Sequence, residues 1–167
     1  GFAAYQAANR APRPSAPPSF AQHVDLKPFQ RIAVQADGRL RSFESHAKTY
    51  MGYIAGPRLI DGQSNGFTYL DLIFRPEQYA DRDLIYVKNE NVRAQILEVL
   101  KKSSNYDPQR AASFFKGGLI SRVLLAEPNV RTLLRRLGED LVRTAKVVDS
   151  IQSAVSVCDP RLLAENL

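Results

Sequence analysis

Hydrophobic residues recur with their most regular spacing near the C-terminus of the chain, and this pattern predicts a long helix. Pro128 suits the first turn of a helix, and from there apolar residues alternate at steps of four and three, interrupted by one threonine. Such a 3.5-residue repeat predicts one helix over 128–157, roughly 40 Å long. We define the heptad stripe as Val130, Leu134, Leu137, Leu141, Thr144, Val148, Ile151 and Val155.

The heptad stripe has two interpretations, packing on the core of the chain itself and docking of a partner helix. Leu133 and Val142 widen the stripe, which favours packing on the core. Gly138 weakens the helix by about 1 kcal/mol relative to alanine, which argues against an isolated zipper. If the stripe is an interface, we expect it to be formed by Leu134, Leu137, Leu141, Val148 and Ile151.

The sequence RIAVQADGRLRS at 31–42 predicts a short β-hairpin. A two-residue loop, DG, would pair Val34 with Arg41 and mix apolar and charged residues on one face. A three-residue loop, ADG, places Val34 opposite Leu40 and uses Gly38 in the left-handed conformation that such loops require. We therefore expect the three-residue loop.

A capped helix is predicted directly after the hairpin. Ser42 has the side chain of an N-cap, and Gly56 followed by Pro57 ends the helical pattern. Apolar residues lie at helical spacing between these two signals. They are Phe43, Ala47, Tyr50 and Ile54.

The middle of the chain alternates between short helical and extended patterns. Residues 67–74 predict a helix that is bounded by a proline, and 83–88 predict a buried strand. Asn89 is the expected N-cap of a helix that continues to about Lys101. A loop with at most one helical turn is expected over 103–118, followed by a short helix over 119–127.

Composition divides the chain into an arm and one domain. Residues 10–19 contain four prolines, so residues 1–29 are predicted to form an extended linker or arm. The 138 residues from 30 to 167 suffice for a single compact domain. The predicted fold class is α+β and mostly helical, with a small hairpin and strand element packed on several helices and one long C-terminal helix.

Charge and cysteine usage narrow the classes of partner. The net charge is +6, but Lys and Arg are spread along the chain as on a solvated surface, so no nucleic-acid partner is predicted. The single Cys158 excludes an internal disulfide and a zinc site built on several cysteines. Apolar runs fall far short of the roughly 20 residues that a membrane span needs. Residues 1–30 do not predict an intact signal peptide.

Candidate catalytic and ligand-binding residues are few. The chain has two histidines, His23 and His46, and neither has a second histidine at the spacing that metal-binding helices use. His46 is the one candidate haem ligand, although a solvent-facing or capping role is favoured for it. Glycine-rich phosphate loops, the G-x-S-x-G elbow and C-x-x-C-H are all missing from the sequence. We therefore predict that the protein is not an enzyme.

The sequence GRLRSFESHAK at 38–48 resembles a motif in extracytoplasmic segments of CcsA/ResC-type cytochrome c biogenesis proteins, which handle haem. The preceding IAVQADG and the later LDLIFRPEQYADRDLIYVKNENVRAQI follow the same pattern in the same order, so the resemblance covers about residues 30–100. Ser42 stands where the motif has proline, and His46 where it has an apolar residue. The residues that carry the motif are Gly38, Arg39, Arg41, Glu44, Ser45, Ala47 and Lys48.

The resemblance implies a non-catalytic module of a cytochrome c biogenesis system, outside the cytoplasm and close to the membrane. Its expected partners are a membrane-embedded haem-handling subunit or apocytochrome c, and it would position haem, apocytochrome or partner subunits. The Trp-rich haem motif of the family has no counterpart in this chain, which contains no tryptophan. No tightly bound cofactor is therefore expected, and haem would come through a partner. The alternative is a general interaction subunit of a membrane-associated complex that docks through its heptad helix.

Overall fold

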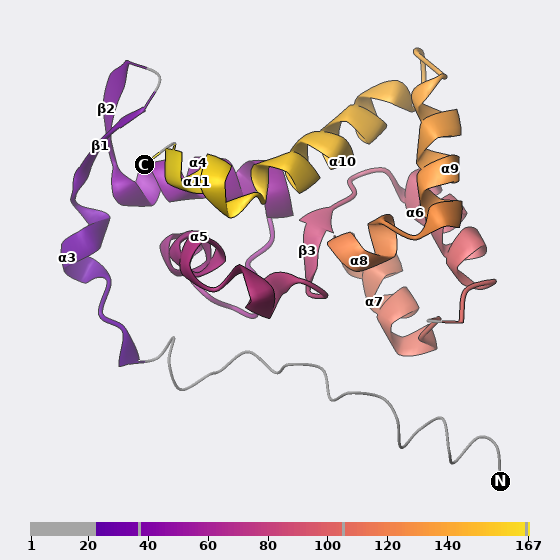
Figure 1. Cartoon of the computed structure of the whole chain (residues 1–167), viewed down its shortest axis with the longest axis horizontal. Helices are drawn as coiled ribbons and strands as arrows, with labels where there is room; N and C mark the ends of the chain where they lie inside the picture. Colours follow the sequence, from indigo (N-terminus) through magenta and orange to yellow (C-terminus); the bar gives the residue numbers. More distant parts are fainter. Residues whose placement is uncertain (1–22, 37, 105, 166) are drawn as a thin grey trace, which may run out of the picture.

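The computed structural model describes residues 23–36, 38–104, 106–165 and 167 of the chain. These residues form a mostly helical fold with two small two-stranded antiparallel sheets, so the predicted α+β class is confirmed (Figure 1). Most of the arm predicted over 1–29 lies outside the described residues. The first labelled element, α3 (Lys27–Gln30), begins at the end of that segment.

Strands β1 (Ala33–Ala36) and β2 (Arg39–Ser42) form the predicted hairpin, but with a different loop. Val34 pairs with Arg41, so the connection is two residues long. The prediction of a three-residue loop, which would place Val34 opposite Leu40, is therefore wrong.

Burial explains why the hairpin takes the shorter loop. The side chain of Val34 is 5% exposed while that of Leu40 is 76% exposed, so the two lie on opposite faces. Among the hairpin residues whose burial is described, Val34 alone is buried. Gly38 has a φ of +71°, the left-handed conformation that a two-residue loop also requires.

Helix α4 (Phe43–Ala55) begins and ends at the predicted signals. The Ser42 hydroxyl accepts a hydrogen bond from the Ser45 amide at 3.3 Å, which satisfies one amide of the first turn. Gly56 ends the helix with a φ of +60°. A Cβ at this position would lie 2.3 Å from Cδ1 of Tyr86, so only glycine fits this close approach.

The next elements agree with the sequence-based expectations. The Asn89 side chain accepts a hydrogen bond from the amide of Val92 at 3.1 Å and caps the predicted helix. A 3-10 turn follows the first helix of this region. Pro76 supplies the fixed φ at the start of that turn. The elements are α5 (Asn65–Phe74), η1 (Pro76–Tyr79), β3 (Asp83–Tyr86) and α6 (Glu90–Leu100).

Two expectations for residues 103–127 are wrong. The predicted loop contains a helix of ten residues, α7 (Pro108–Gly117), whose first turn is capped by the carboxylate of Asp107. The start of the predicted short helix is instead a strand, β4 (Leu119–Ser121), and the helical part is reduced to α8 (Arg122–Leu125). Strand β4 forms because it pairs with β3, a partner more than 30 residues away.

The prediction of a single helix over 128–157 is also wrong. The chain turns back between α9 (Pro128–Gly138) and α10 (Ala145–Val157). The Asp140 carboxylate accepts hydrogen bonds from the amides of Val142 and Arg143 at 3.2 and 3.1 Å. The Thr144 hydroxyl donates to the carbonyl of Leu137 at 2.5 Å. These local bonds compete with helix continuation and stabilise the turn that Figure 1 shows.

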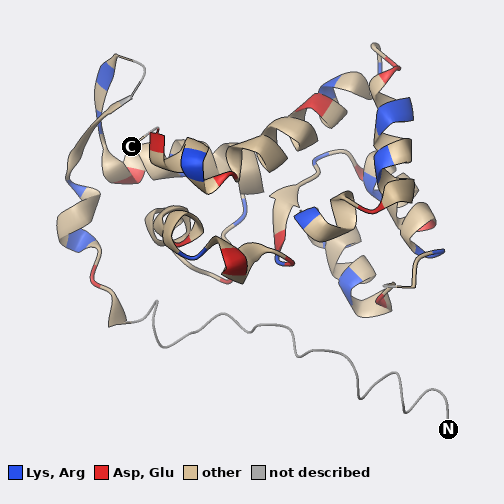
Figure 2. Cartoon of the chain, viewed as in Figure 1, with Lys and Arg blue, Asp and Glu red and all other residues tan. Residues whose placement is uncertain are grey.

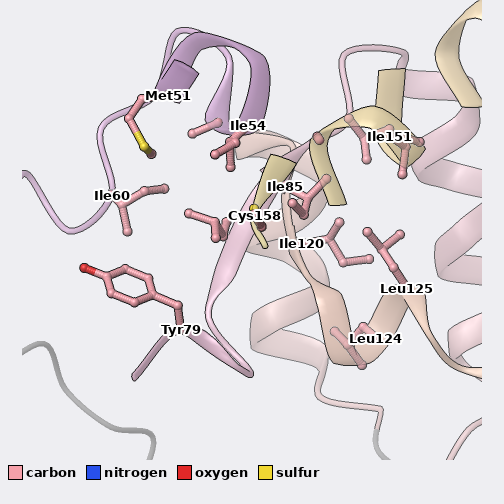
Figure 3. Packing of buried hydrophobic residues seen from close by; sticks show 14 of the residues in the cluster. Met51, Ile54, Ile60, Tyr79, Ile85, Ile120, Leu124, Leu125, Ile151 and Cys158 are labelled. Carbon is pink, nitrogen blue, oxygen red and sulfur yellow. The ribbon is translucent and has the colours of Figure 1, made fainter. Parts of the chain in front are cut away.

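One hydrophobic core joins both halves of the chain. Figure 3 shows Ile54, Ile85, Ile120 and Ile151, which come from α4, β3, β4 and α10, in one cluster. Helix α4 packs on α5, β3 and α10, and the last helix, α11 (Pro160–Glu165), packs on α5. The C-terminal helices therefore complete the core that the N-terminal elements begin.

The heptad stripe lies in this core, which confirms packing on the chain itself. Leu134, Leu137, Val148 and Ile151 are all buried, so the interpretation of these four residues as an interface is wrong. Leu141 is 81% exposed in the turn between α9 and α10, beside the exposed Val142.

Substitution of two residues of the heptad stripe tests this arrangement. Leu137→Glu places a carboxylate in the core, and we expect it to lower the free energy of unfolding by more than about 3 kcal/mol. Leu141→Glu introduces the same charge in the exposed turn and should change it by less than about 0.5 kcal/mol. Urea unfolding followed by circular dichroism measures both. Equal losses of unfolding free energy in the two variants would contradict the turn between α9 and α10.

Candidate functional site

The motif residues at 38–48 occupy the hairpin and the first turns of α4, and the structure divides them into two groups. Ala47 is buried in the core, and Gly38 forms the hairpin loop. The others carry their polar side chains on or near the surface. Arg39, Ser45 and Lys48 are exposed, while Arg41 and Glu44 are half-buried.

Glu44 joins the start of α4 to the start of α5. Its Oε2 atom is buried, has no hydrogen-bond partner among the described residues, and lies 3.0 Å from where a Cβ on Gly66 would be. Gly66 is in the first turn of α5, where the helix dipole is positive and favours a carboxylate. The acidic position of the motif therefore has a structural role in this fold.

His46 is fully buried, so its expected solvent-facing or capping role is wrong. The imidazole lies between two tyrosine rings, 4.7 Å from the centroid of Tyr50 and 5.5 Å from that of Tyr69. Its Nε2 atom is 3.2 Å from the Tyr69 hydroxyl oxygen. A haem iron would reach this nitrogen only if the core opened.

The Tyr69 hydroxyl determines which nitrogen of His46 carries a proton. It donates its single hydrogen to the carbonyl of Leu163 at 2.7 Å, and can therefore only accept from the imidazole. His46 Nε2 must then be protonated and donate. Burial, and next the neighbouring Tyr50, raise the pKa of Tyr69 well above its usual range, so the hydroxyl stays protonated.

A second polar cluster connects α5 to η1. Arg75 Nε donates to Asp71 at 2.5 Å, and the Tyr79 hydroxyl donates to the other carboxylate oxygen at 2.8 Å. Burial, followed by this hydrogen bond, raises the pKa of Tyr79 above its usual range. Both carboxylate oxygens of Asp71 are occupied by these partners, so the arrangement stabilises the α5–η1 corner.

A third cluster, which the sequence did not reveal, attaches α7 to the second sheet. The Arg110 guanidinium lies 2.7 Å from a carboxylate oxygen of Asp83 and 3.0 Å from one of Asp81. The Ser121 hydroxyl donates to the same oxygen of Asp81 at 2.9 Å. Arg110 and Asp83 are 27 residues apart in the chain, so no short-range sequence pattern predicts the pair.

Cys158 lies in the core beside the C-terminal end of α10. It is fully buried, and burial raises the pKa of its thiol to about 12, with nearby Arg122 acting in the opposite direction. A thiol with this pKa is almost entirely protonated at neutral pH and is a poor nucleophile. Cys158 therefore acts as an apolar core residue.

Three further observations concern metal binding, membrane spans and similarity to known proteins. In the part of the chain that the structure describes, no group of three or more His, Cys, Asp or Glu side chains is placed to hold a metal ion. No helix among the described residues is long and apolar enough to cross a membrane. Comparisons with models of protein families, with curated proteins and with solved structures found no match to this chain.

The hairpin is the candidate site, because it combines exposed apolar and basic side chains at one end of the molecule. Figure 1 shows it extending beyond the helices, and Figure 2 shows basic positions along it. Strands β1 and β2 pair only with each other within the described residues, so their outer edges are available to another strand. We define the hairpin surface as Phe29, Ile32, Arg39, Leu40 and Arg41.

Removal of the Tyr69 hydroxyl tests the buried contact with His46. Tyr69→Phe leaves a protonated imidazole nitrogen and the Leu163 carbonyl without their partner, so we expect a loss of about 1–3 kcal/mol in the free energy of unfolding. Tyr53→Phe, at an exposed position of α4, the helix that carries His46, is the control and should cost less than about 0.5 kcal/mol. In ¹⁵N spectra, His46 Nε2 should have the shift of a protonated nitrogen. An unprotonated Nε2 would contradict the assignment.

The raised pKa of Cys158 predicts slow alkylation. At pH 8 the folded thiol should react with iodoacetamide about 10³-fold more slowly than the thiol of the unfolded chain, because the folded thiol contains about that much less thiolate. Comparable rates in buffer and in concentrated urea would contradict its burial.

The same thiol makes folding sensitive to alkaline pH. Its pKa is higher in the folded chain, so its contribution is complete below about pH 9 and is lost as the pH rises toward 12. At pH 10 this loss is about 1.4 kcal/mol, and it should be missing in Cys158→Ala. Urea titrations at pH 8 and 10 measure the difference, and identical losses in the two proteins would exclude this cause.

Proposed function

We propose that this chain is a non-catalytic module of a CcsA/ResC-type cytochrome c biogenesis system, located outside the cytoplasm and docked through its hairpin surface. It would position a membrane-embedded haem-handling subunit or apocytochrome c. The observation that carries the proposal is that the residues of the resemblance gather in the hairpin and α4, where basic and apolar side chains face solvent.

The three matched stretches also form one body in space. The first two stretches cover the hairpin and the first half of α4, and the third runs from α5 through η1 and β3 into α6. Helix α4 packs directly on α5 and on β3. The region of resemblance is thus contiguous in three dimensions, which supports its interpretation as one functional unit.

A non-catalytic role agrees with how the polar side chains are used. Asp71, Tyr79 and Arg110 are engaged in hydrogen bonds and ion pairs within the fold. His46 is held between tyrosines, and Cys158 lies in the core. In this proposal haem comes through a partner and is not held tightly by the chain.

Docking through a heptad helix is not part of the proposal. That alternative needs a continuous apolar face along one long helix, but the chain turns back between α9 and α10, and most apolar positions of these helices are buried in the core. The hairpin replaces it as the contact, since Leu40 and Ile32 are exposed apolar side chains beside open strand edges.

Two substitutions in the hairpin test this function. Leu40→Asp together with Arg39→Glu removes an apolar and a basic contact from exposed positions without disturbing the core. We expect at least a tenfold loss of co-purification, in mild detergent, with the membrane-embedded haem-handling subunit of the source organism. Haem-stained c-type cytochromes should decrease in parallel.

The matched control is Val142→Asp with Arg143→Glu, an exposed apolar and basic pair in the turn between α9 and α10. It changes the net charge equally and should leave co-purification within twofold of the wild type. If the folded hairpin variant co-purifies and matures cytochromes as the wild type does, the proposed function is wrong.

A further inference from the structure

A groove between α9 and α10 is a second surface, at the other end of the long axis from the hairpin (Figure 1). It has a volume of about 920 Å³ and is lined by residues of α8, α9 and α10. An α-helix about 10 Å wide rises about 1.5 Å per residue, so the groove has room for about two helical turns. This size suits a short segment of a partner protein.

One wall of the groove is basic. Arg131 and Arg135 lie one helical turn apart on α9, and Arg122 joins them from the start of α8. Figure 2 shows this concentration of basic positions on α9. Within the described residues none of these three arginines forms an ion pair, and the one acidic residue of the lining is Asp149.

Arg122 gives a separate indication that the groove takes an acceptor. Its Nε atom is buried and has no hydrogen-bond partner among the described residues. A buried donor without a partner is costly, and a bound water, ion or ligand group is one way in which such a donor is satisfied. A carboxylate placed in the groove would provide the missing acceptor.

The remaining lining is apolar at the floor, and the facing wall on α10 carries Asp149 beside uncharged polar side chains. Leu125, Leu134 and Val155 supply the apolar floor, and Gln152 and Ser156 lie on the α10 side. An apolar floor beside a basic wall complements a helix that has an apolar stripe flanked by carboxylates.

We propose that this groove docks an acidic amphipathic helix of a partner protein, whose carboxylates pair with Arg122, Arg131 and Arg135. The proposal goes beyond the function proposed for the hairpin and does not depend on it. Two other occupants fit the charge less well. Residues 1–22 of the chain contain no Asp or Glu but two arginines, and a second copy carries the same net charge of +6.

The test measures binding of a designed peptide to the full chain. The peptide is a fluorescein-labelled helix of about four turns with leucines at i, i+3, i+4 and i+7 and glutamates beside them; its partner peptide has lysines in place of the glutamates. Fluorescence anisotropy at low and at physiological salt gives both affinities. We expect saturable binding of the glutamate peptide, at least tenfold tighter than that of the lysine peptide.

Charge reversal localises the site. Arg131→Glu with Arg135→Glu should weaken binding of the glutamate peptide at least tenfold and strengthen binding of the lysine peptide. The control, Arg136→Glu with Lys146→Glu, makes the same change in net charge at exposed positions outside the groove lining, and should stay within twofold of the wild type. Circular dichroism verifies that each variant is folded.

Several results would overturn the proposal. They are an absence of saturable binding, equal affinity for the two peptides, and equal weakening by the groove and control substitutions. Vesicles that contain phosphatidylglycerol are a competitor in the same assay. If they displace the peptide and their own binding is lost on Arg131→Glu with Arg135→Glu, the groove is an anionic-lipid surface and the proposed helix is excluded. None of these outcomes depends on whether the hairpin binds its partner.

Discussion

The buried hydroxyl of Tyr69 is the contact on which the arrangement of the chain depends most. It accepts from His46 on α4 and donates to the carbonyl of Leu163 on α11, two residues that are more than 100 positions apart. Both hydrogen bonds lie inside the core, where a lost partner is expensive to replace. The contact therefore fixes α5 between the first long helix and the last helix, and closes the two halves of the chain on one another.

This closure determines which surfaces are left for function. The turn held by Asp140 and Thr144 brings α10 back onto α4, so most apolar residues of the heptad stripe are used inside the molecule. Helix α9 runs into this turn from a different direction, and the groove with its arginines lies between the two helices. At the opposite end the capped start of α4 carries the hairpin outward (Figure 1). One core thus carries two different surfaces, the hairpin surface and the arginine-lined groove.

Elements with local causes could be predicted from the sequence, and elements with distant causes could not. Ser42 and Asn89 cap their helices within three residues, so their starts were visible in the sequence. Strand β4 needs β3 as its partner, and the burial of His46 needs Tyr69, so both were missed. The break after Gly138 was hidden because Asp140 lies between positions of the heptad stripe and Thr144 is the single polar residue in the stripe. The arginine-lined groove was missed for a related reason, since it exists only after the chain turns back.

Native-state amide hydrogen exchange across a range of urea concentrations is the most direct test of this closure. If one core joins both halves, the slowest amides of α4, α5, α10 and α11 should reach a common free energy of exchange, equal to that of global unfolding. The hairpin and the turn between α9 and α10 should exchange faster. Exchange of α10 and α11 at a clearly lower free energy than α4 and α5 would contradict the account, because the C-terminal helices would then open while the N-terminal half stays folded.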